Sequence, residues 1–78
     1  MANLKKYNEV FKSCFQIDET QFEGLTYQSV ESWDSVGHMG LIAALEDAFD
    51  IMMDTDDIID FSSYKKGIEI LKKYDVNI

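Results

Sequence analysis

A serine that follows an aspartate, at the start of an apolar helix pattern, is the part of this chain with the clearest chemical potential. Asp34 precedes Ser35, and aspartate is one of the residues preferred at a helix N-cap. With Asp34 as the cap, Ser35 becomes the first helical residue. Its hydroxyl then faces solvent at the positive end of the helix, where free backbone N–H groups favour an anion. The pair fits attachment of a phosphate-linked group to Ser35, and an ordinary helix cap is the alternative.

The other residues that could do chemistry form weaker patterns. His38 lies three residues after Ser35 on roughly the same helix face. It could be a general base, a contact for a phosphate or a partner, or an ordinary exposed histidine. A serine hydrolase is disfavoured because the chain has no second histidine and no recognisable oxyanion loop. Cys14 is the single cysteine, which excludes an internal disulfide.

The many acids between positions 50 and 60 suggest a calcium site, but their spacing is wrong for one. A calcium loop of the EF-hand type needs a glycine at its sixth position and a glutamate at its twelfth. Counted from Asp50, those positions hold Thr55 and Phe61. Counted from Asp54, they hold Ile59 and Lys65. The sequence therefore predicts no metal site.

Two long helices account for the first two thirds of the hydrophobic pattern. Apolar residues recur at three- and four-residue steps over residues 3–16, where Asn3 is the expected N-cap, and again over residues 35–49. The expected buried stripe of the second helix consists of Val36, Met39, Ile42, Leu45 and Phe49. The connection over residues 17–33 has one helical turn near residues 19–22. Its apolar side chains should hold it against the core, since long free loops are rare in small domains.

A short helix over residues 54–60, capped by Asp54 or Thr55, and a last helix from residue 62 or 63 to Tyr74 complete the pattern. No segment alternates as a strand does. The sequence therefore predicts an all-α fold, a small antiparallel bundle of three main helices plus one short helix. At 78 residues, the chain is expected to form a single domain over residues 1–78.

The charge distribution limits the class of partner. The formal net charge is −8, and no lysine or arginine occurs between Ser13 and Tyr64, a stretch that holds twelve of the fifteen acids. Such a surface repels nucleic acid and anionic lipid and attracts basic partners. No signal peptide is recognised, and no apolar run approaches the ~18 residues needed to cross a bilayer. We expect a cytoplasmic protein that does not bind nucleic acid, does not insert into membranes and is a monomer.

The chain resembles the acyl carrier protein family over nearly its whole length. The carrying motif of that family is Asp-Ser-Leu, which here reads Asp34-Ser35-Val36. The helix behind it ends in a Leu-acid-acid-x-Phe pattern, here residues 45–49, and a short acidic helix and a closing helix follow as far as Leu71. The fold implied by this resemblance is the same small helical bundle.

Some positions depart from the family pattern. Valine replaces the leucine after the serine, and Asp54 stands where a proline is common. Gly37, His38 and Gly40 occupy positions where the family often places acids. These departures favour a specialised carrier over the general fatty-acid member.

The resemblance implies a function for individual residues. Ser35 would accept 4′-phosphopantetheine from coenzyme A through a separate phosphopantetheinyl transferase, and Asp34 and Val36 would belong to the motif that the transferase recognises. The protein would then be a phosphoprotein that carries an acyl group as a thioester on the arm, as in fatty acid or polyketide biosynthesis. It would not itself be an enzyme. In this family an acyl chain can fold back into a cleft between helices, here expected to be lined by Met39, Ile42, Leu45, Phe49, Ile59, Phe61 and Ile68. A fully packed core is the alternative.

Partner contacts are expected on the second and third helices. Acyl-loading and acyl-transferring enzymes with basic docking surfaces would bind there. The expected contact residues are Gly37, Met39, Gly40, Glu46, Asp47, Asp54, Asp56 and Asp57. The alternative function is an unmodified acidic helical adaptor that binds a basic protein without using Ser35.

Overall fold

The computed structural model describes residues 2–78 and contains four α-helices and one short 3-10 helix. In chain order these are α1 (Ala2–Phe15), η1 (Glu19–Gln21), α2 (Ser35–Phe49), α3 (Thr55–Asp60) and α4 (Tyr64–Lys72). Over residues 2–78 there is no β-strand, and one isolated bridge joins Thr26 to Ser63. The predicted all-α bundle of three main helices and one short helix is confirmed.

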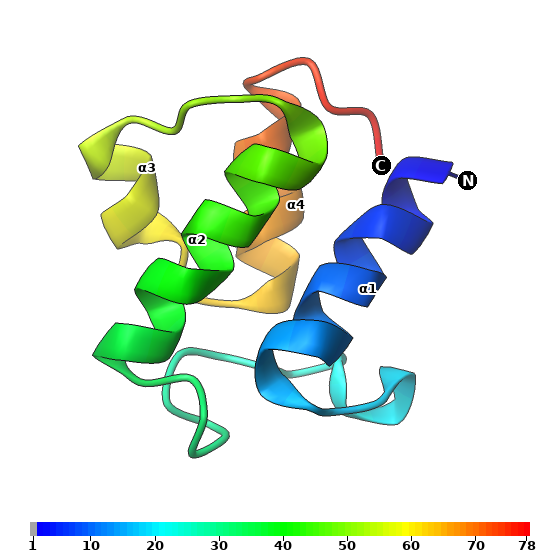
Figure 1. Ribbon diagram of the computed structural model, residues 1–78, viewed down its shortest axis with the longest axis vertical. Coiled ribbons are helices and arrows are strands. Elements are labelled where there is room, and N and C mark those ends of the chain that lie inside the picture. The colour runs from blue at the N-terminus through cyan, green and yellow to red at the C-terminus, as the bar shows by residue number, and fades with distance from the viewer. Residues whose placement is uncertain (1) are drawn as a thin grey trace.

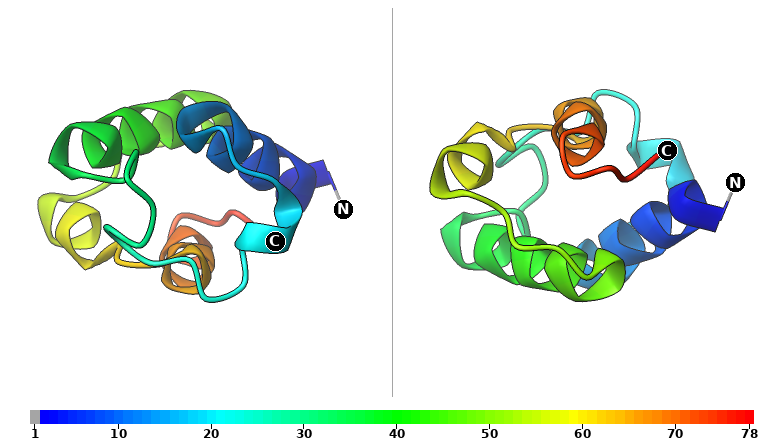
Figure 2. Two further views of the ribbon diagram at one scale, coloured as in Figure 1. Left: turned by 90° about the horizontal axis from the view of Figure 1, so that it is seen from below. Right: turned by 90° about the horizontal axis from the view of Figure 1, so that it is seen from above.

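Successive α-helices run in opposite directions and form two rows. In Figure 1, α1 and α3 run downward while α2 and α4 run upward. The views from below and above place α1 and α2 side by side, with α3 and α4 facing them (Figure 2). No helix within residues 2–78 combines the length and the apolar character that crossing a bilayer requires.

An aromatic cluster forms the centre of the core. Phe11 on α1 is fully buried, and its ring lies 4.9–6.4 Å, centroid to centroid, from six other aromatic rings. These are the rings of Tyr7, Phe15, Phe22, Trp33, Phe61 and Tyr64. The buried Tyr7 hydroxyl donates a 2.6 Å hydrogen bond to the Tyr64 carbonyl, and burial raises the pKa of Tyr7 well above its ordinary value. Large aromatic side chains supply much of the apolar area that so short a chain can bury.

The long connection between α1 and α2 is held to the bundle by its apolar side chains and by backbone hydrogen bonds. Phe22 and Leu25 are buried. The Tyr27 N–H donates to the Ser62 carbonyl at 2.8 Å, and the Tyr64 N–H donates to the Leu25 carbonyl at 2.9 Å. These bonds join the middle of the connection to the segment at the start of α4.

Two sequence-based expectations are wrong in detail. Asn3 is not an N-cap but lies inside α1, where its side-chain amide donates to the Asn77 carbonyl at 2.9 Å. Val36 and Met39 do not join the buried stripe of α2, which consists of Leu41, Ile42 and Leu45. Each three-residue step falls about 60° short of a full helical turn, so three such steps carry a residue about 180° around the helix. Val36 therefore faces away from Leu45.

Candidate functional site

Ser35 lies where the sequence predicts, at the first position of α2 and in solvent. Asp34 is the N-cap, and its Oδ1 accepts a 2.8 Å hydrogen bond from the Gly37 N–H. Ser35 itself is exposed, and none of residues 2–78 forms a side-chain hydrogen bond with its hydroxyl. A tether attached to this oxygen would leave the protein without disturbing the core. The positive end of α2 would favour a phosphate there.

An apolar groove of about 310 Å³ opens beside this hydroxyl. Its walls come from α2, from α3, from the connection before α2 and from the connection between α3 and α4. The lining residues are Tyr27, Ser35, His38, Met39, Ile58, Ile59, Phe61 and Ser62. Of the cleft residues expected from the family resemblance, Met39, Ile59 and Phe61 lie here. Ile42 and Leu45 are instead buried in the core.

His38 connects three segments beneath the groove. Its Nδ1 accepts a 3.0 Å hydrogen bond from the Trp33 indole N–H, and its Nε2 lies 2.8 Å from the Ile58 carbonyl oxygen. This pattern fixes a neutral ring with its proton on Nε2, which donates to Ile58. Because both ring nitrogens are occupied, His38 is not placed to take a proton from Ser35. The idea of an ordinary exposed histidine is also wrong, since the side chain is half-buried.

Trp33 is a packing residue rather than a binding platform. Its side chain is fully buried, and its ring stacks on Phe15 with centroids 5.1 Å apart. The sequence places His38 five residues after Trp33, a spacing that offers no signal of a hydrogen bond between the two rings. The contact arises because Trp33 belongs to the connection and His38 to the helix, and the chain turns between them.

The two glycines of α2 have different surroundings. A Cβ on Gly37 would lie 2.0 Å from the Ser32 carbonyl oxygen, whereas a Cβ on Gly40 would meet nothing within 4 Å. Gly37 therefore allows the chain's own backbone to approach α2 closely, just before Ser35. Gly40 has open space around it, and its expected role as a partner contact stays a prediction.

The acids expected at the partner surface divide into two groups. Asp47, Asp54 and Asp56 are exposed. Glu46 is half-buried, and its carboxylate accepts a 2.9 Å hydrogen bond from the Met53 N–H. Glu46 therefore helps to close the turn after α2.

Asp57 corrects the expectation of a surface acid, because it is only 6% exposed. The Lys73 ammonium lies 2.6 Å from its Oδ1, and the Tyr74 hydroxyl donates to its Oδ2. The Tyr74 oxygen also accepts the Asp54 N–H at 2.9 Å. Hydrogen bonds from Lys73 and Tyr74 lower the pKa of Asp57. We call Asp54, Asp57, Lys73 and Tyr74 the α3 anchor, because they hold α3 to the end of α4.

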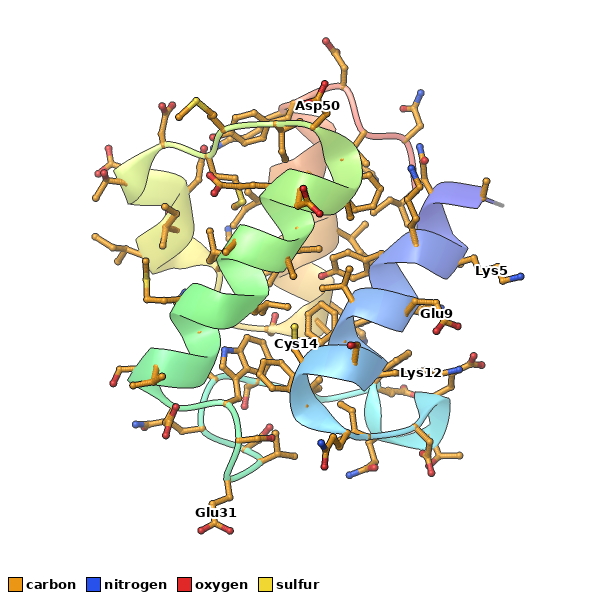
Figure 3. All side chains as sticks on the ribbon, in the orientation of Figure 1. Lys5, Glu9, Lys12, Cys14, Glu31 and Asp50 are labelled. Atoms are coloured by element: carbon orange, nitrogen blue, oxygen red, sulfur yellow. The ribbon has the colours of Figure 1, made fainter. Side chains whose placement is uncertain are left out.

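Metal and thiol chemistry receive no support from the described residues. Within residues 2–78, no group of three or more His, Cys, Asp or Glu side chains is arranged to hold a metal ion. Cys14 lies on α1 and faces α2 (Figure 3). It is half-buried, and burial raises the pKa of its thiol, so the thiolate needed for nucleophilic attack is disfavoured.

The site thus consists of one exposed hydroxyl at a helix N-terminus, beside an apolar groove supported by the Trp33–His38–Ile58 hydrogen bonds. It can present an attached group, and within residues 2–78 no side chain is hydrogen-bonded to the Ser35 hydroxyl. No family model, curated protein or solved structure matches this chain. The function is therefore inferred from the site's own residues.

Proposed function

We propose that this chain is an acyl carrier protein, with a 4′-phosphopantetheine arm attached to Ser35. The observation that carries the proposal is the position of Ser35. Its hydroxyl is exposed at the first residue of α2, capped by Asp34, at the edge of an apolar groove. A phosphodiester at this point gains from the helix dipole and from unpaired backbone N–H groups. The resemblance of residues 34–36 and 45–49 to the carrier family supports the same assignment.

The attachment reaction requires a separate enzyme. The Ser35 oxygen would form a phosphoester bond to the phosphopantetheine phosphorus of coenzyme A, the bond from that phosphorus to the adenosine bisphosphate would break, and the hydroxyl proton would be lost. That proton needs a base, and both nitrogens of nearby His38 are already hydrogen-bonded. A phosphopantetheinyl transferase would supply the base. The thiol at the end of the arm would then hold the acyl group.

The groove beside Ser35 would shelter the apolar part of a short cargo. Its volume of about 310 Å³ is at the lower end of the range for small-molecule sites. Tyr27, Met39 and Ile59 supply apolar surface, whereas Ser62 supplies a hydroxyl. The core behind it is filled by fully buried side chains such as Leu45 and Phe61, so a long chain would need displacement of packed residues.

The test is intact-mass analysis after incubation with coenzyme A and a purified broad-specificity phosphopantetheinyl transferase. The unsubstituted chain should gain the mass of one arm. Ser35→Ala should gain none, while circular dichroism shows the same helix content. Ser62→Ala is the matched control, because Ser62 is an exposed serine that lines the same groove. Its variant should be modified normally.

The rival function is the unmodified adaptor, which predicts a different outcome. If several transferases of broad specificity leave the unsubstituted chain unmodified, the carrier proposal fails. Modification of Ser35→Ala, or loss of modification in Ser62→Ala alone, would place the attachment at another residue. Intact mass of the protein purified from its own cells would identify the arm and its cargo together.

A further inference from the structure

We infer that partner enzymes dock beside Ser35 chiefly through apolar contact, with charge in a secondary role; this inference rests on the proposed carrier function. Three large apolar side chains are exposed there. Val36 is 80% exposed, Met39 57% and Ile59 71%. These three residues are named here the apolar patch.

The apolar patch belongs to one continuous surface rather than to scattered positions. Met39 on α2 and Ile59 on α3 line the same groove as Ser35, and Val36 lies three residues before Met39 on α2, a spacing that makes the two side chains neighbours on the helix surface. Side chains of two helices therefore stand around one opening. Neighbouring apolar side chains left in water are unfavourable, and on a soluble protein they mark a surface that a partner covers.

The first three turns of α2 contribute no charge to this surface. Residues 35–45 contain no Lys, Arg, Asp or Glu. The acids lie at the border. Asp34 caps the helix, Asp56 lies one turn before Ile59 on the same face of α3, and Glu31 projects from the connection at this end of α2 (Figure 3). None of these three acids takes part in an ion pair within residues 2–78.

This arrangement specifies the chemistry of the partner. Its contact surface should present apolar side chains at the centre and lysine or arginine around them. Burying a methionine or isoleucine contributes more than an exposed ion pair, whose attraction is largely offset by desolvation and screening. The border acids would then orient the partner and raise the association rate.

A second copy of the chain fits this surface poorly. Two copies that met patch to patch about a two-fold axis would bring each acidic border against its own copy. With no lysine or arginine between positions 13 and 64, the segments that form the surface could not neutralise those acids. A basic partner protein is the occupant that the charges favour.

The experiment measures the steady-state kinetics of a purified broad-specificity phosphopantetheinyl transferase with coenzyme A, varying the carrier chain. Met39→Gln/Ile59→Gln keeps good helix formers at both positions and leaves Ser35 and its neighbours intact. KM for the double variant should rise at least about tenfold, which corresponds to about 1.4 kcal/mol, with kcat within about twofold. Met52→Gln is the matched control, since Met52 is 87% exposed but lies in the turn between α2 and α3. Its KM should not change.

The outcomes separate the two proposals. No modification of the unsubstituted chain overturns the carrier function, and this inference with it. A different result overturns this inference alone. In that result Met39→Gln/Ile59→Gln is modified with unchanged KM, while KM of the unsubstituted chain rises more than tenfold between low and high salt. Charge would then dominate the docking. A dimer in sedimentation experiments that the double variant dissociates would make a second copy the occupant, and would also overturn it. Circular dichroism checks that each variant is folded.

Discussion

The Ser35 site and the α3 anchor use similar residues in opposite ways. Asp56 and Asp57 are consecutive acids in the first turn of α3. Asp56 faces solvent near the apolar patch without an ion pair among residues 2–78. Asp57 is buried, and its carboxylate contacts Lys73 and Tyr74. One helix thus presents an unpaired acid on one side and a fully paired acid on the other.

Because of this difference, substitutions in the two regions should change different properties of the protein. In the α3 anchor the polar groups are bonded to one another, so changes there should alter the free energy of unfolding. Around Ser35, the hydrogen bonds lie beneath the surface, between Trp33, His38 and Ile58. The exposed Ser35 side chain above them forms no hydrogen bond within residues 2–78. Substitutions that break the hydrogen bonds between Trp33, His38 and Ile58 should therefore alter both the free energy of unfolding and the modification of Ser35.

The largest effect is expected from Gly37→Ala, which forces the backbone just before Ser35 to move. Its Cβ would lie 2.0 Å from the Ser32 carbonyl oxygen, so the backbone of the connection must move. We expect a loss of about 3 kcal/mol in the free energy of unfolding, the upper part of the usual range for overpacking, and slower modification of Ser35. Urea unfolding and the transferase assay measure the two effects.

Gly40→Ala is the control within the same helix. The added methyl carbon would meet no neighbouring group within 4 Å, and alanine is the better helix former by about 1 kcal/mol. This variant should gain up to that amount. Equal destabilisation by both substitutions would show that the contact with Ser32 has no special cost.

A smaller loss is expected from His38→Ala, which leaves the buried Trp33 indole N–H without its acceptor. A buried donor left unpaired costs about 1–3 kcal/mol, so we expect about 2 kcal/mol. In a Trp33→Phe background the donor is already absent, and the same substitution should cost less. A double-mutant cycle from urea unfolding measures this coupling. Strictly additive effects would contradict the proposed hydrogen bond.

Local chemistry was enough to predict the position of Ser35. Asp34 and the apolar pattern behind it predict both ends of α2, and the structure confirms residues 35–49. A cap and the first helical residue depend on neighbours within four positions, so the exposed Ser35 hydroxyl follows from the sequence directly. The exposure of Val36 could also have been predicted by following the helix angle instead of counting three-residue steps.

Contacts between distant positions could not be predicted in the same way. Asp57 and Lys73 are 16 positions apart, and His38 and Ile58 are 20 apart. Nothing in the local sequence distinguishes Asp57 from Asp56, since both suit the first turn of a helix. Only the packing of α3 against the end of α4 determines which of the two acids is paired.

The smallest effect, present at neutral pH and lost in acid, is expected from Asp57→Asn compared with Asp56→Asn. Hydrogen bonds from Lys73 and Tyr74 lower the pKa of Asp57 in the folded protein. A lowered folded-state pKa stabilises the fold above the unfolded value of about 3.9, and this stabilisation is lost as the pH falls through the folded-state pKa.

Asp57→Asn should therefore lower the melting temperature at pH 7 and flatten its decline below about pH 4. Asp56→Asn should leave the melting temperature and its acid dependence nearly unchanged, because the Asp56 carboxylate forms no ion pair within residues 2–78. Thermal unfolding from pH 2 to 7 measures both variants. Modification of Ser35 should continue in Asp57→Asn, because the α3 anchor lies on the side of α3 that packs on α4. If the melting temperatures of both variants depend on pH in the same way, then it is wrong to assign Asp57 to the α3 anchor and Asp56 to the partner surface.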